Sequence, residues 1–136
     1  MLQRLRPLLG GSDWRTRTGL ALTTIAVLFL LFDSTGKLLR VAPVVEGTAQ
    51  LGYPDEIIRT LGVILALCVL TYVNPRTAVL GAVLLTGYLG GAVATHARVG
   101  SPLLTHVLFP IYVAVFIWGG LALRDERVRR LIHGGS

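Results

Sequence analysis

Four apolar segments fill most of this 136-residue chain and decide the solvent in which it can fold. They occupy residues 19–32, 57–73, 77–97 and 103–123. A bilayer core requires about 20 apolar residues in helical form, and the last two segments meet that length with almost no charge. The second is slightly short, and the first is long enough only if its helix continues to Lys37. A soluble domain of this size has no room to bury four such helices, so the sequence predicts a polytopic membrane protein.

Composition narrows the classes of function. The formal net charge is +6, but the basic residues stand mainly at the chain ends beside apolar spans. That placement favours contact with an anionic membrane surface, and we expect no nucleic-acid partner. Cys68 is the single cysteine, which excludes an intramolecular disulfide and a CxxC redox pair.

The arginines predict the orientation in the membrane. They are concentrated in the tails, residues 1–18 and 124–136, and one more stands in the turn at 74–76. Cytoplasmic loops carry the Lys and Arg excess, so both termini and this turn are expected inside. The connection 33–56 and the turn 98–102 then lie outside, which requires an even number of spans.

The expected fold is all-α: one polytopic four-helix membrane bundle covering residues 1–136. Short turns make the last three helices antiparallel neighbours, and the first helix closes the bundle. The outer connection 33–56 mixes apolar residues with glycine and proline. It is read either as a lid-like interfacial or re-entrant segment, or as an extension of the first helix followed by an ordered loop. The predicted spans are about residues 17–37, 57–73, 77–97 and 103–123.

Two glycines, Gly87 and Gly91, are four residues apart in the third apolar segment. This spacing lets another helix approach closely. We expect packing within the monomer, and a homodimer seam is the alternative.

Polar residues inside membrane spans are rare and costly, which makes each a functional candidate. The alternating topology places those of this chain at one level, the outer end of the bundle. The candidate ligand-binding residues at this level are Asp33, Lys37, Arg59, Thr95, His96 and His106.

Asp33 and Lys37 are spaced i, i+4 and can pair on one helix face. Lys37 is the only lysine in an otherwise arginine-based set of cations, and its compact ammonium differs chemically from a guanidinium. Candidate catalytic groups are Lys37 and His96 as acid and base, with Asp33 orienting the lysine. A plain snorkelling pair remains the alternative. A metal site of His96, His106 and Asp33 matches no standard ligand spacing, and no metal is expected.

The chain resembles the DoxX-like family of small four-helix bacterial membrane proteins. The resemblance rests on LFDSTGKLL at residues 31–39, LGYP at 51–54 and GAVATHARVGSP at 91–102. It implies location in the bacterial inner membrane, and its LGYP motif adds Tyr53 to the candidate ligand-binding residues. Proteins of this kind are associated with quinone-linked sulfur oxidation and oxidative-stress complexes, so it also implies a quinone as ligand or a membrane redox partner.

Two functions follow as hypotheses. The first is a binding or accessory subunit that holds a lipid-like or quinone-like molecule at the outer mouth of the bundle. The second is a membrane enzyme acting on a lipophilic small molecule, with Lys37 and His96 as acid-base groups.

Overall fold

The computed structural model describes residues 12–134, and every regular element in this part of the chain is a helix. All four apolar segments form helix, which confirms the predicted all-α class. The helices are α2 (Ser12–Leu38), α3 (Ala42–Gln50), α4 (Ile57–Val73), α5 (Ala78–Arg98), the π-helical turn η1 (Leu103–Val107), α6 (Phe109–Arg124) and α7 (Glu126–Ile132).

Three stretches are long and apolar enough to cross a membrane: Trp14–Leu38, Ala78–Arg98 and Leu103–Arg124. Helix α4 is equally apolar but has only 17 residues. In the most apolar window of each long stretch, only 28% to 33% of the residues are buried inside the protein. The remaining apolar side chains face outward, as expected for a protein whose surroundings are lipid rather than water.

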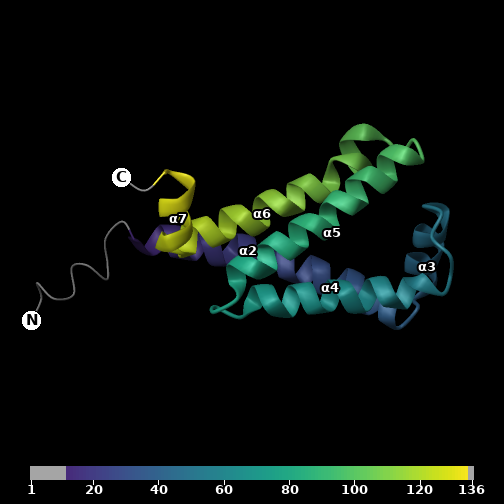
Figure 1. Cartoon of the computed structure of the whole chain (residues 1–136), viewed down its shortest axis with the longest axis horizontal. Helices are drawn as coiled ribbons and strands as arrows, with labels where there is room; N and C mark the ends of the chain where they lie inside the picture. The colour runs from purple at the N-terminus through teal and green to yellow at the C-terminus, as the bar shows by residue number, and fades with distance from the viewer. Residues whose placement is uncertain (1–11, 135–136) are drawn as a thin grey trace, which may run out of the picture.

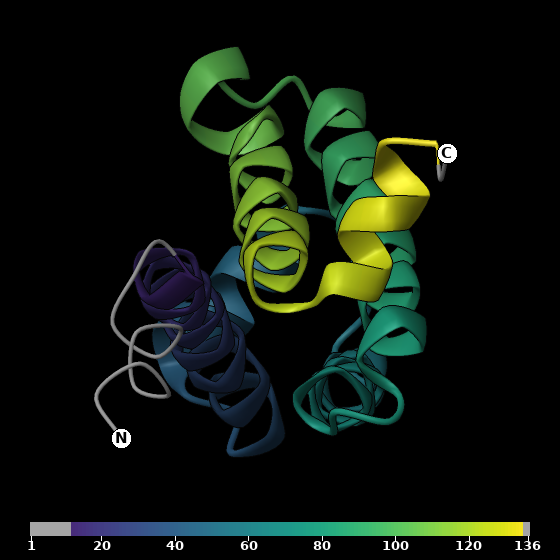
Figure 2. The same cartoon turned by 90° about the vertical axis from the view of Figure 1, so that its left-hand side faces the viewer.

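The four main helices form a closed ring in which α2 and α5 each pack against both α4 and α6. Figure 2 views this ring along its axis, with α7 in yellow towards the viewer. The helices lie close together at the end that carries α7, which we call the converged end. At the other end the α5–α6 pair diverges from the α2–α4 pair (Figure 1). We call this the open end, and it carries α3 and η1.

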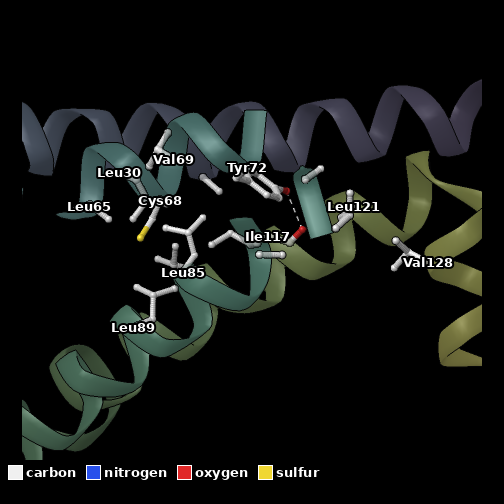
Figure 3. Close-up of a cluster of buried hydrophobic side chains, with 14 residues drawn as sticks. Leu30, Leu65, Cys68, Val69, Tyr72, Leu85, Leu89, Ile117, Leu121 and Val128 are labelled. Carbon is white, nitrogen blue, oxygen red and sulfur yellow. Dashed lines mark hydrogen bonds between the residues drawn. The ribbon is translucent and has the colours of Figure 1, made fainter. Parts of the chain in front are cut away.

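The hydrophobic core lies between the ring helices and extends to α7. Its centre is Tyr72, which is fully buried and donates a hydrogen bond from its hydroxyl to the carbonyl of Ile117 at 2.8 Å (Figure 3). Leu121 and Val128 continue this cluster towards the converged end. Because Val128 belongs to α7, the core fixes that short helix to the bundle.

Close approach of the helices depends on glycine. A Cβ atom at Gly81 would lie 2.2 Å from the backbone nitrogen of Tyr72, so only glycine permits the tight α4–α5 hairpin. A Cβ atom at Gly19 would lie 2.8 Å from the carbonyl oxygen of Gly120, where α2 meets α6. These contacts hold the bundle together away from the open end.

Within residues 12–134, Gly87 and Gly91, which we call the glycine stripe, do not pack against another helix of the monomer as predicted. A Cβ atom built at Gly87 or Gly91 meets no other atom within 4 Å, so no helix of the described chain packs on the stripe. The two glycines instead border open space, because α5 diverges from α2 and α4 towards the open end.

The fourth apolar segment is not one uniform helix. The π-helical turn η1 precedes α6, and Pro110 occupies the first turn of α6. Proline has no N–H to donate to the carbonyl of residue 106, so a regular α-helix cannot run through this point. The chain near His106 therefore forms a π-turn, and a new helix begins after it.

The connection between the first two spans contains an extension of the first helix and a separate short helix. Helix α2 extends to Leu38, and the separate short helix α3 follows. Pro43 stands in the first turn of α3, where its missing N–H costs nothing. Figure 1 shows α3 beside the ends of α2 and α4, apart from α5. The role of α3 as a lid stays a prediction.

Candidate functional site

A half-enclosed cleft of about 760 Å³ lies at the open end, between the diverging helix pairs. Residues from α2, α3, α4, α5, η1 and α6 line it. We call it the polar cleft, because its wall contains six of the seven candidate binding residues, namely Asp33, Lys37, Tyr53, Thr95, His96 and His106. Helix ends that are far apart in sequence thus meet around one cavity.

The charged pair Asp33–Lys37 forms one side of the polar cleft. Both residues lie on α2, one turn apart, and the Lys37 ammonium donates to the Asp33 carboxylate. The lysine side chain is only 10% exposed, whereas that of the aspartate is 30% exposed. The buried cation therefore depends on this carboxylate, and the carboxylate keeps a face towards the cleft.

A hydroxyl pair joins the loop after α3 to the wall formed by α5. The hydroxyls of Tyr53 and Thr95 are 2.8 Å apart, and Thr95 also donates to the carbonyl of Gly91. Close by, Arg98 donates from Nη2 to the carbonyl of Leu51 at 2.9 Å. These bonds fasten the loop to the last turn of α5, so one flank of the cleft is closed by polar contacts.

Two imidazoles form the third polar group. The rings of His96 and His106 meet edge to face, with centroids 5.8 Å apart. Nδ1 of His96 lies 3.1 Å from the hydroxyl of Ser101, and Nδ1 of His106 lies 2.8 Å from that of Thr105. Since Nδ1 of each ring is engaged, Nε2 is the nitrogen with which each histidine could meet a ligand.

The remaining wall is apolar. Phe29 of α2 and Phe109 of α6 are in T-shaped contact, with ring centroids 5.1 Å apart, and both are partly exposed. Leu30, Pro110 and Val113 extend this wall. The polar cleft therefore offers hydrogen-bonding groups beside an aromatic and aliphatic surface, which is the usual composition of a small-molecule site.

Arg59 is the predicted residue that the structure does not bring to the cleft. It is exposed on α4, while its neighbour Ile58 is fully buried against the rest of the bundle. Conversely, sequence reasoning missed Tyr88, a half-buried residue that lines the cleft. Its position seven residues before Thr95 puts both on one face of α5, and that spacing could have revealed it.

A metal site requires several His, Cys, Asp or Glu side chains close together. Within residues 12–134, no group of three or more His, Cys, Asp or Glu side chains is arranged to hold a metal ion. The cleft is instead equipped for hydrogen bonding and for one ion pair.

The apolar helices and the family comparison together define a multi-pass integral membrane protein of helical type. More particularly, the chain belongs to the DoxX-like family, whose model matches residues 21–120. The match includes all six cleft-lining candidates and confirms the resemblance noted in the sequence. Comparisons with curated proteins and with solved structures found no match.

Proposed function

We propose that this protein binds a lipophilic small molecule with a polar head in the polar cleft. The main observation in support of this proposal is that hydrogen-bonding side chains from separate helices line one cavity beside an aromatic wall. Polar groups at this depth are costly unless they meet one another or a ligand.

In this proposal the chain is a single four-span domain in the bacterial cytoplasmic membrane, with both termini inside. The arginines at the converged end support that orientation. The polar cleft then opens at the outer leaflet, and its bound molecule is quinone-like or lipid-like. A quinone head would offer carbonyl acceptors to Nε2 of the histidines and to hydroxyl donors, while its chain would contact the wall formed by Phe29 and Phe109. Such a protein would serve as an accessory subunit of a membrane redox complex.

Two matched glycine variants test ligand binding. Gly91 borders the polar cleft, whereas Gly90 borders a smaller groove of about 130 Å³ between α5 and α6. A Cβ at either position meets nothing within 4 Å, so the fold should tolerate both substitutions. Gly91→Leu should fill the cleft and abolish binding, and Gly90→Leu should retain it.

The measurement is native mass spectrometry of the protein in nanodiscs, before and after incubation with a short-chain benzoquinone. Extraction and mass analysis of co-purified lipids identify any endogenous molecule. Equal retention by wild type and by both variants would place the ligand elsewhere. No bound molecule in any of the three would overturn the proposal.

The enzyme hypothesis rests on a separate observation, a buried lysine beside a carboxylate in the same cleft as a histidine. Lys37 would act as acid and His96 as base, with Asp33 positioning the ammonium. Lys37→Arg distinguishes the hypotheses, because a guanidinium retains the charge but does not give up its proton. An enzyme would lose turnover of the ligand identified above with binding preserved, whereas a binding protein would show no turnover in either form.

A further inference from the structure

A second polar feature lies at the converged end, away from the polar cleft. Arg124 is the last residue of α6, and its guanidinium carbon lies 5.5 Å from the centroid of the Tyr72 ring. Its Nε and Nη2 atoms are buried, and neither has a hydrogen-bond acceptor among residues 12–134. A cation therefore points into the end of the bundle with two donors unsatisfied.

The carboxylates that follow this arginine in sequence are engaged elsewhere. Asp125 accepts a hydrogen bond from the backbone N–H of Arg127 at 2.9 Å and pairs with its guanidinium at 3.2 Å. Glu126 lies 3.6 Å from Arg129 and 3.5 Å from Arg130. Asp125 and Glu126 thus pair with the arginines of α7, and Arg124 has no carboxylate partner in the described part of the chain.

An unpaired buried cation is costly, and this one is compensated only in part. Stacking over an aromatic ring offsets only part of the cost of leaving charged donors buried without an acceptor. An external anion would supply hydrogen-bond acceptors for the two unsatisfied donors of Arg124. The guanidinium fork matches the oxygens of a phosphate in two parallel hydrogen bonds, and the end of a spanning helix lies at the level of lipid phosphates.

We propose that Arg124 forms an anion site at the converged end that takes a phosphate group, supplied by an anionic phospholipid or by free phosphate. The arginine is only half-buried, which leaves an approach at the end of the bundle. Helix α7 lies across this end (Figures 1 and 2), fixed by the buried side chain of Val128.

The test compares wild type with Arg124→Gln and a matched control, Arg130→Gln. Both variants remove one positive charge from the same end, but Arg130 is exposed and already paired with Glu126. Each protein is placed in nanodiscs of phosphatidylcholine alone, with added phosphatidylglycerol, or with inorganic phosphate. Native mass spectrometry counts retained phosphatidylglycerol, and thermal unfolding reports the stabilisation by each anion.

Wild type and Arg130→Gln should retain phosphatidylglycerol and unfold at a higher temperature in its presence. Arg124→Gln should bind it at least roughly 30-fold more weakly and show no thermal shift. In phosphatidylcholine alone, Arg124→Gln should be as stable as wild type or more stable, because the unpaired cation is gone. A shift with inorganic phosphate in place of the lipid would identify the source as soluble. Equal anion binding by all three proteins would overturn the proposal, as would lower stability of Arg124→Gln without any anion effect in wild type.

Discussion

The ion pair Asp33–Lys37 predicts an asymmetry between two isosteric substitutions. Asp33→Asn leaves the ammonium of Lys37 without its partner while only 10% of that side chain is exposed. Breaking a buried ion pair from one side costs about 3–5 kcal/mol, and the partial exposure of the pair puts this case near 3 kcal/mol. Lys37→Met leaves a carboxylate that is 30% exposed, and because this charge is less buried than the ammonium the expected cost is about 1 kcal/mol.

The double variant Asp33→Asn/Lys37→Met should be more stable than Asp33→Asn alone, because no buried charge is left. Arg40→Gln is the control, since it breaks the more exposed ion pair with Asp55 and should cost less than about 1 kcal/mol. The assay is equilibrium unfolding in mixed micelles at pH 7, which yields a free energy of unfolding for each protein. A larger loss from Lys37→Met than from Asp33→Asn would refute the reasoning, as would a double variant whose loss equals the sum.

Three further predictions concern other parts of the chain. Single cysteines at Glu56 and Asn74, at opposite ends of α4, should differ in labelling by an impermeant thiol reagent on intact cells that lack the native cysteine. Only the cysteine at position 56 should react, and equal labelling of the two positions would contradict the predicted topology. Gly81→Ala should lower the free energy of unfolding by about 2–3 kcal/mol, because its Cβ would meet the α4 backbone, whereas Gly87→Ala should raise it by up to about 1 kcal/mol. A hydrogen bond from the side chain of Arg127 holds the pKa of Asp125 below its usual range. The carboxylate therefore stabilises α7 above the usual pKa and loses this effect as pH falls through the lowered value. Circular dichroism between pH 2 and 7 should show that dependence, which Asp125→Asn should abolish.

The helices could be predicted because their apolar runs have the length that a bilayer demands. The predicted segment 57–73 coincides with α4, and 77–97 differs from α5 by one residue at each end. Helix α2 begins earlier than its predicted span because helical conformation continues past the apolar run, through Arg15 and Arg17. Helix α7 was missed because it depends on a tertiary contact, the burial of Val128 in the core.

The sequence could predict which helix end carries each candidate side chain, but not the direction in which that side chain points. Distance from a helix end sets the depth of a side chain, and this brought the two histidines to the same cavity from different helices. Direction depends on which face of a helix its neighbours cover. Helix α4 buries Ile58, and one residue further is a rotation of about 100°, which turns Arg59 outward. The exposed glycine stripe followed from the divergence of the helix pairs, which no local pattern encodes.

The short length of α4 has a consequence for the surrounding lipid. Its 17 residues extend about 25 Å, some 5 Å less than a typical hydrocarbon core of about 30 Å. A bilayer crossed by α4 must thin beside it, and the exposed Arg59 near its start can reach up to the headgroups. This hydrophobic mismatch costs fractions of a kcal/mol per ångström, so the protein should prefer thin membranes. Acyl-chain length thereby becomes a variable that acts on this helix more than on its longer neighbours.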